Sequence, residues 1–288
     1  MKSIDQSKAL QQIVPLVLTV VILAVLTVIL YAFIFLIDAF HFGENIVLIA
    51  RPVDVMVGLT IYLKTSIDFA IFMGRLMSAN PGWKNRIALE IGTALGNALG
   101  TLVVIAIWII FKEVELLLAL MVFLAALVLF ELAHGGLEHF ASWEGGTTFK
   151  RYTYLFLHHS LDIILKFIDP VLRRIMPDLS AKMQGKASLN WKQLFMFSMS
   201  IPFILGLDDF AGYVPLFSVI NVYGFAIGVF LGHTILNIAL FISPSRTIVA
   251  VKNEYVSFLG TLAFIGLALY GFYEVFRILT HLSGANGV

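Results

Sequence analysis

The sequence predicts an all-α protein that crosses a lipid bilayer about seven times. Hydrophobic residues make up 60% of the 288 residues and charged residues only 13%, whereas a soluble domain carries about 25% charged residues. The mean hydropathy is +0.95. Long apolar stretches reach the roughly 20 residues that a spanning helix needs, and lysine and arginine gather between particular pairs of them. These observations favour a polytopic membrane protein.

Seven stretches are long and apolar enough to be spanning helices. Along the chain they cover residues 13–37, 53–77, 87–111, 115–133, 192–216, 220–242 and 256–279. The polar segment from Met1 to Gln12 precedes the first stretch, and no small-residue cleavage site follows that stretch. We therefore expect the first stretch to be a retained helix.

One long polar interruption, residues 134–190, separates the fourth stretch from the fifth. Its basic residues are Lys150, Arg151, Lys166, Arg173, Arg174, Lys182 and Lys186. Loops rich in lysine and arginine stay in the cytoplasm, so counting spans outward places the N-terminus in the cytoplasm and the C-terminus on the opposite side. Apolar residues spaced three and four apart predict an amphipathic helix over His158–Met176. This helix either rests on the membrane surface, which we favour, or caps the bundle.

Two short motifs occur twice in the same order. Asp68-Phe69-Ala70 in the second stretch aligns with Asp209-Phe210-Ala211 in the fifth, and residues 91–97 in the third align with residues 227–233 in the sixth. Each copy has three spans, so the copies cross the membrane in opposite directions and form an inverted repeat. The predicted organisation is an N-terminal helix (1–45), a first three-helix repeat (46–133), a cytoplasmic loop (134–190) and a second three-helix repeat (191–288).

An inverted repeat predicts transport. It places two related copies of a site near the middle of the bilayer, where rocking of one half against the other exposes them alternately to each side. The alternative is that the duplication only builds a bundle in which the aspartates hold helices together. We consider this weaker, because a charged residue at mid-membrane depth costs about 2.5 to 3.5 kcal/mol on insertion scales.

Acidic and amide side chains within the predicted spans mark a candidate site for a substrate or ion. Its predicted members are Asp68, Asp208, Asp209, Asn97, His233, Asn237, Lys64 and Glu90. Asp68 and Asp209 are the predicted metal ligands, since hard divalent cations prefer carboxylate and carbonyl oxygens, with amide oxygens as helpers. Glu90 would be an entry carboxylate. His233 would be a ligand, a proton relay or a hydrogen-bonded core residue.

Lys64 stands four residues before Asp68, which places both on one face of a continuous helix, where they can form an ion pair. One interpretation is that Lys64 neutralises Asp68, so that there is no cation site. The other is that lysine and a cation, or lysine and a proton, alternate as partners of the carboxylate. The spacing leaves both open.

A second group of metal-ligand residue types begins at the end of the fourth stretch. The predicted members of a second metal site are Glu131, His134, Glu138 and His158, with His159 and Asp162 nearby. Glu131 and His134, and His134 and Glu138, have helical spacing, and imidazole suits transition metals. Gly135 and Gly136 interrupt that helix, and solvation at the membrane interface is the interpretation we favour for this group.

The Asp-Phe-Ala pair and the Gly-x-x-x-Gly-Asn/His pair resemble the superfamily that includes the lysine exporters, the TerC proteins and the cadmium and manganese exporters. The similarity to TerC covers Ile67-Asp68-Phe69 and the basic turn from Lys84 to Arg86, and overall it extends over residues 55–111 and 195–242. The resemblance implies a three-plus-three inverted fold, export of a divalent metal such as manganese, and Asp68 and Asp209 as central ligands. Phe69, Phe210, Lys64 and the His/Glu loop depart from that pattern.

We therefore predict a secondary transporter, not an enzyme, that exports a cation such as manganese; the metal is the substrate and no cofactor is expected. The alternatives are an exporter of an amino acid or other small organic solute, with Lys64 meeting a carboxylate, and a membrane enzyme or scaffold that uses the loop from Glu131 to Asp162.

The absence of cysteine excludes disulfides and dithiol redox chemistry. The net charge of +1 gives no reason to expect a nucleic-acid partner. Expected partners are the lipid bilayer, the transported metal ion or solute and a second copy in a homodimer, in a bacterial plasma or inner membrane.

Overall fold

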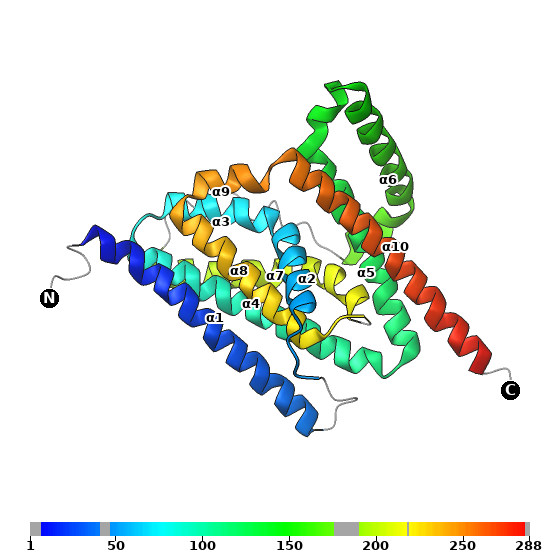
Figure 1. The fold of residues 1–288 in the computed structure, drawn as a ribbon, viewed down its shortest axis with the longest axis horizontal. Coiled ribbons are helices and arrows are strands. Elements are labelled where there is room, and N and C mark those ends of the chain that lie inside the picture. The colour runs from blue at the N-terminus through cyan, green and yellow to red at the C-terminus, as the bar shows by residue number, and fades with distance from the viewer. Residues whose placement is uncertain (1–6, 41–46, 176–189, 218, 286–288) are drawn as a thin grey trace. The chain divides into compact units, whose positions relative to one another are not determined.

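The computed structural model describes residues 7–40, 47–175, 190–217 and 219–285, and every regular element within them is a helix. The all-α prediction is therefore confirmed. In chain order the elements are α1 (Lys8–Ala39), α2 (Pro52–Thr65), α3 (Ile67–Ala79), α4 (Trp83–Lys112), α5 (Glu115–Leu137), the 3₁₀ helix η2 (Glu138–Gly145), α6 (Thr148–Ile175), α7 (Trp191–Tyr213), the 3₁₀ helix η4 (Val214–Leu216), α8 (Val222–Ile242), α9 (Pro244–Val251) and α10 (Glu254–Ala285) (Figure 1).

Five helices in the described part of the chain are long and apolar enough to cross a membrane. They are Ala9–Ala39, Trp83–Lys112, Glu115–Gly145, Val222–Ile242 and Glu254–Leu282, and α2 with α3 makes a sixth if this bent pair is one span. The predicted span 192–216 corresponds to α7, which is not among them; side chains 204–212 of α7 lie outside the description. The total of seven spans therefore stays a prediction.

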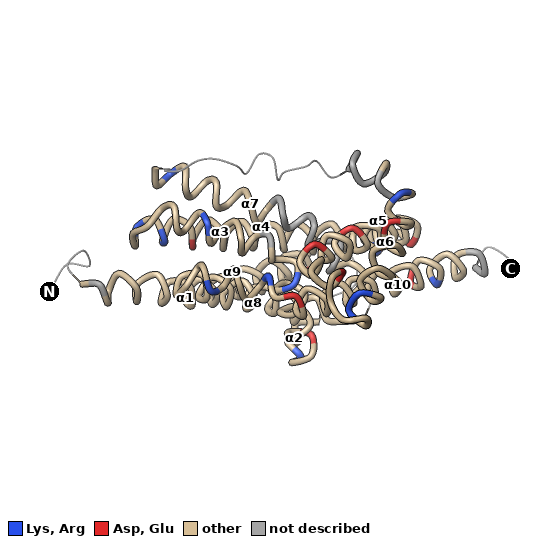
Figure 2. The backbone as a smooth tube through the Cα atoms, turned by 90° about the horizontal axis from the view of Figure 1, so that it is seen from above, with Lys and Arg blue, Asp and Glu red and all other residues tan. Residues whose placement is uncertain are grey.

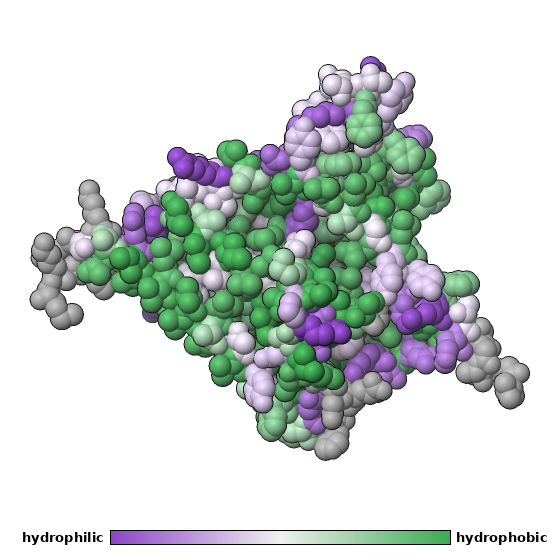
Figure 3. All heavy atoms as spheres, in the orientation of Figure 1, coloured by the Kyte–Doolittle hydropathy of each residue, from purple (hydrophilic) through white to green (hydrophobic). Residues whose placement is uncertain are grey.

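The surface of these helices is suited to lipid. Val17, Val28 and Phe35 on α1 are each more than half exposed, as are Leu259 and Phe276 on α10. Hydrophobic residues dominate the face drawn in Figure 3, and most of the helical trace in Figure 2 carries no charged residue. Such large exposed apolar surfaces mark contact with lipid or a partner, and with the long apolar helices they indicate a membrane-embedded protein.

The chain divides into two compact units. Unit 1 comprises Met1–Ile110, Lys186–Asp209 and Val219–Val249, and unit 2 comprises Phe111–Gly185, Phe210–Ser218 and Ala250–Val288. Each unit draws residues from both of the segments predicted as repeats. Unit 1 holds α1 to α3 and α8, with most of α4 and α7, and unit 2 holds α5, α6 and α10.

In unit 1, α2 and α8 run in the same direction in close contact. A Cβ atom added to Gly58 would lie 2.1 Å from the Phe225 carbonyl oxygen, and one added to Gly228 would lie 2.1 Å from the Val55 carbonyl oxygen. Further along both helices, a Cβ on Gly232 would meet the Tyr62 ring at 2.8 Å. The glycines thus let two backbones approach as only small residues permit.

α4 and α7 make the second parallel pair of unit 1. Gly92 faces the Phe195 carbonyl oxygen, which a Cβ would meet at 2.6 Å, and Gly96 faces the Met199 carbonyl oxygen at 2.1 Å. The Ser198 hydroxyl donates to the Ala88 carbonyl oxygen at 3.4 Å, and earlier in both helices Trp191 donates to the Lys84 carbonyl oxygen at 3.2 Å. The predicted glycine ridges therefore serve close packing.

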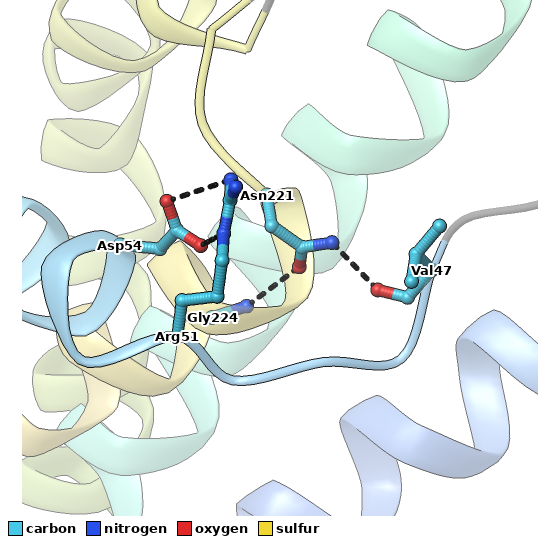
Figure 4. A network of polar contacts seen from close by, with 5 residues as sticks. All are labelled: Val47, Arg51, Asp54, Asn221 and Gly224. Atoms are coloured by element: carbon cyan, nitrogen blue, oxygen red, sulfur yellow. Dashed lines mark hydrogen bonds and ion pairs between the residues drawn. The ribbon is translucent and has the colours of Figure 1, made fainter.

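A polar network fixes the beginnings of α2 and α8 against each other (Figure 4). Arg51 binds the buried Asp54 carboxylate through two contacts of 2.7 and 3.2 Å. Asn221 caps α8 by accepting from the Gly224 backbone N–H at 3.1 Å, and its amide donates to the Val47 carbonyl oxygen at 2.6 Å. Arg51 and Asn221 thus each complete the first turn of their own helix, and the Asn221–Val47 bond joins the start of α8 to the segment that leads into α2.

In unit 2, α5 and α10 pack antiparallel. Ser257 and Thr261, in the first turns of α10, donate to the carbonyl oxygens of Gly136 and Ala133 near the end of α5, at 2.9 and 3.3 Å. Further along α10, Gly271 lies against Ala126, earlier in α5. Residues 158–175 of the predicted amphipathic helix form the later part of α6, which begins at Thr148 and packs on α5, and Met176 lies outside the described residues.

The predicted helix 53–77 is wrong in one respect, because it is interrupted between α2 and α3, whose axes differ by 64°. Ser66 has φ −85° and ψ 18°, outside the helical region. Just before it, the Thr65 hydroxyl bonds back to the carbonyl oxygens of Ile61 and Tyr62, both at 3.2 Å, a contact that bends helices. Lys64 and Asp68 therefore belong to two different helices, so the continuous helix assumed in the prediction is interrupted between them, and the Asp68 side chain lies outside the described part of the structure.

Candidate functional site

Asn237 is the centre of a polar network buried inside unit 1. Its Nδ2 atom lies 3.0 Å from Glu90 Oε2, 3.2 Å from Thr93 Oγ1 and 3.0 Å from His233 Nε2. Glu90 and Thr93 stand on α4, whereas His233 and Asn237 are one turn apart on α8. All four side chains are buried, with Glu90 and Asn237 at 0% exposure.

The network extends to α2 through Tyr62. The Tyr62 hydroxyl lies 2.8 Å from His233 Nδ1, and the two rings meet edge to face with centroids 5.9 Å apart. Phe69, on α3, covers another side of the imidazole at 6.1 Å. Both nitrogens of His233 are thus engaged, one toward α2 and the other toward α4 through Asn237.

The hydrogen positions in this network are constrained by Thr93. Its hydroxyl donates to the Leu89 carbonyl oxygen at 2.8 Å, so its oxygen accepts from Asn237. With Nδ1 of His233 protonated, the imidazole donates to Tyr62 and accepts from Asn237. With Nε2 protonated, the Asn237 oxygen would have to take the place of its nitrogen and would face both the Thr93 oxygen and the Glu90 carboxylate, which offer it no hydrogen. The contacts therefore favour one arrangement, in which His233 carries its proton on Nδ1.

Three buried polar atoms of the site make no hydrogen bond within the described part of the chain: Glu90 Oε1, Asn237 Oδ1 and Asn97 Nδ2. Asn97 is one turn beyond Thr93 on α4. Thr19, on α1, also borders the Glu90 carboxyl group, and its hydroxyl can donate either to that group or to the Pro15 carbonyl oxygen, which lies 3.0 Å away. An unmatched buried acceptor is costly, and a buried carboxylate needs a proton or a cation.

The chemistry of this donor set suits a cation. Glu90 Oε1 and Asn237 Oδ1 are a carboxylate oxygen and an amide oxygen, the types that hard divalent cations prefer. Within the described part of unit 1, no hydrogen bond or ion pair joins a lysine or arginine to Glu90. The network can therefore hold a proton or a metal ion among its oxygen atoms.

The network unites three of the predicted site residues, Glu90, His233 and Asn237, by hydrogen bonds. Asn97 is buried one turn beyond Thr93 on α4, and its amide nitrogen makes no hydrogen bond within the described part of the chain. Lys64 is half-buried in the last turn of α2. The side chains of Asp68, Asp208 and Asp209 lie outside the described part of the structure, so the roles predicted for them stay predictions.

Sequence reasoning missed Tyr62 and Thr93 as members of the network. Tyrosine in membrane helices is most common at the interface, so Tyr62 gave no signal on its own. One clue was available in the spacing along α2. Tyr62 follows Val55 by seven residues and Gly58 by four, so all three residues lie on one side of the helix, the side that packs on α8.

The predicted second metal site is brought together in part in unit 2. His134 on α5 and His158 on α6 both contact Asp162, which had been noted beside them, whereas Glu138 is exposed in the 3₁₀ helix η2 and is not in the cluster. Glu131 stands one turn before His134 but outside this group of three.

Fold and site together define an all-helical membrane-embedded protein with a polar network enclosed by its helices. No family model matches the chain, and neither curated proteins nor solved structures give a match.

Proposed function

We propose that the protein is a secondary transporter that exports a cation, with a divalent metal such as manganese as the substrate. The observation that carries this proposal is the pair of unmatched buried oxygens, Glu90 Oε1 and Asn237 Oδ1, in a network of oxygen and imidazole ligands. Asn97 and His233 complete the proposed site. The carboxylate would exchange a proton for the metal ion, and the imidazole would receive or pass on that proton.

The packing of the helices supports an inverted three-plus-three repeat. In the proposed repeat, α2 corresponds to α7, α4 to α8 and α5 to α10. The parallel pair α2 and α8 then corresponds to the parallel pair α7 and α4, and the antiparallel pair α5 and α10 corresponds to itself. Gly228 packs against the Val55 carbonyl oxygen and the Leu59 amide nitrogen. Gly92 packs in the same way against the Phe195 carbonyl oxygen and the Met199 amide nitrogen, so the two glycines make equivalent backbone contacts. This likeness supports alternating access by two related halves.

The sequence motifs support the proposed kinship with the lysine exporter superfamily. The motifs that carry the resemblance include Asn97 and His233, which occupy equivalent places after Gly96 and Gly232. In this proposal Asp68 and Asp209 belong to the ion path, as the resemblance implies. We place the N-terminus in the cytoplasm and the protein in a bacterial inner membrane, on the distribution of basic residues.

Transport by purified protein in liposomes tests the proposal. We expect uptake of Mn²⁺ into liposomes loaded with a metal-sensitive dye, and we expect Glu90→Gln and Asn237→Leu to reduce it to the level of empty liposomes. Glu115→Gln is the matched control, since Glu115 is an exposed carboxylate at the start of α5. Each variant is compared at equal amounts of monodisperse protein. Wild-type flux in both Glu90→Gln and Asn237→Leu would contradict the proposal.

A further inference from the structure

Two histidines and one aspartate form a compact cluster in unit 2, apart from the network just described. Asp162 accepts from both imidazoles: its Oδ1 lies 2.9 Å from His134 Nε2, and its Oδ2 lies 2.8 Å from His158 Nδ1. The two rings are 5.6 Å apart. One nitrogen of each histidine and one carboxylate oxygen all lie within 4.8 Å of one another.

This geometry is close to that of a metal centre. Zinc binds imidazole nitrogen and carboxylate oxygen at about 2.0 to 2.2 Å, so the ligand atoms of a tetrahedral site stand about 3.3 Å apart. The two contacts through Asp162 are slightly shorter than this. A bound ion would replace the imidazole hydrogens that these two contacts use, and the three ligand atoms, which lie within 4.8 Å of one another, would adjust to the separations of a metal site.

The helices hold the ligands in position. His158 and Asp162 are one turn apart on α6, so their side chains lie on the same face of that helix. His134 comes from the last turn of α5, which α6 packs against. An ion held by all three would therefore link α6 to α5 at this point.

The cluster is partly open to solution. The Tyr154 ring lies 5.6 Å from that of His158 on one side of it. Lys150, earlier on α6, is engaged with Glu254 at 2.9 Å. The side chains of His134, His158 and Asp162 are 32%, 42% and 39% exposed, so an ion from solution can reach them.

We propose that His134, His158 and Asp162 bind a divalent transition metal ion of the zinc type, with water in the remaining coordination position. Two imidazoles and one carboxylate with an open position are a ligand set that such ions accept. The site is independent of the proposed transport site, because its ligands come from α5 and α6 and include neither Glu90 nor Asn237. It fixes the amphipathic helix α6 to α5 when the metal is bound.

Cobalt binding to detergent-purified protein tests this proposal, because Co²⁺ bound by nitrogen and oxygen ligands in a four-coordinate site gives visible d–d absorption. All proteins carry Glu90→Gln, so that the proposed transport site does not contribute. We expect the parent to bind one equivalent of Co²⁺ with this absorption and to release it when Zn²⁺ is added. His158→Ala and Asp162→Asn should each weaken binding by about 100-fold or more, since even changes around the direct ligands of metal sites cost about 10- to 100-fold.

His159→Ala is the matched control, because His159 is the exposed neighbour of His158 and lies outside the cluster. It should bind Co²⁺ like the parent, and all variants should elute as monodisperse protein. Absence of the absorption in the parent, or equal binding by the parent and by His158→Ala, would overturn the proposal. A flux experiment that fails for Glu90 would leave this result unchanged, so the two proposals are judged separately.

Discussion

The Tyr62 hydroxyl lies 2.8 Å from His233 Nδ1, and this contact joins α2 to α8 within the buried part of unit 1. On the other side of the imidazole, Asn237 leads to the Glu90 carboxylate through contacts of 3.0 Å each. Three helices thus contribute to one continuous row of polar groups. Removing one group of the row would therefore leave its buried neighbours without a hydrogen-bond partner.

Tyr62→Phe should both destabilise the protein and impair transport. The substitution keeps the ring and removes the hydroxyl, which leaves His233 Nδ1 buried without this partner, at a cost of about 1 to 3 kcal/mol. Thermal unfolding in detergent measures the first effect and Mn²⁺ flux in liposomes the second. Tyr273→Phe, on the exposed side of α10, is the control. Equal stability and flux for Tyr62→Phe and wild type would show that the contact has no role.

Gly228→Ala should separate α2 from α8. The new Cβ would lie 2.1 Å from the Val55 carbonyl oxygen and 2.8 Å from the Leu59 nitrogen, and these are backbone atoms that cannot move aside without shifting a helix. We expect a loss of about 1 to 3 kcal/mol in unfolding free energy, as for other overpacked sites.

Gly266→Ala provides the comparison for this glycine prediction. Gly266 is also inside a helix, but a Cβ there meets nothing within 4 Å, so alanine should be neutral or stabilising by up to about 1 kcal/mol. Unfolding in detergent by a denaturant series measures both variants. A Gly228→Ala protein as stable as the Gly266→Ala protein would contradict the close packing of α2 on α8.

Lys150 should stabilise the protein in a manner that disappears at high pH. Its hydrogen bond to Glu254, then that to Tyr255, raises the pKa of the ammonium group above its ordinary value of 10.5, and the group also lies 4.9 Å from the centre of the Trp143 ring. When folding raises the pKa of a group, the folded protein gains stability from its charged form. This stability is fully present at pH values below the pKa in the unfolded chain, and it is lost as the pH rises through the pKa in the folded protein.

The thermal midpoint of wild type should therefore exceed that of Lys150→Met by the same amount from about pH 7 to about pH 10, and the difference should shrink above the ordinary lysine value of 10.5. Lys252→Met, an exposed lysine just before α10, should match wild type throughout. A difference between wild type and Lys150→Met that does not change with pH would assign the effect to packing of the lysine stem instead.

The positions of the helices could be predicted from the sequence because long apolar runs need only length and composition to be recognised. The interruption at Ser66 could not, since it depends on where the Thr65 hydroxyl finds a carbonyl oxygen. Asn97, His233 and Asn237 were predicted because polar residues are rare in such helices. Tyr62 and Thr93 were not, since their roles depend on which face of α2 meets α8 and which face of α4 meets Asn237.

The last prediction concerns which aspartate of α7 is the counterpart of Asp68. The sequence motif aligns Asp68 with Asp209, but the glycine contacts give a different register. Gly228 contacts Val55 and Leu59, and its counterpart Gly92 contacts Phe195 and Met199. Val55 therefore corresponds to Phe195, and Leu59 to Met199. Applied to Asp68, the same separation along the chain leads to Asp208, one residue before Asp209.

We therefore expect Asp68→Asn and Asp208→Asn to abolish Mn²⁺ flux in liposomes and Asp209→Asn to retain a substantial part of it. The reason is the register of the glycine contacts, which, continued along the chain, pairs Asp68 with Asp208. Adjacent Asp→Asn changes are isosteric and match each other as controls, and expression and elution profile should be the same for both. Loss of flux in Asp209→Asn with normal flux in Asp208→Asn would restore the register of the sequence motif and show that the glycine contacts of α4 and α8 are not related by the repeat.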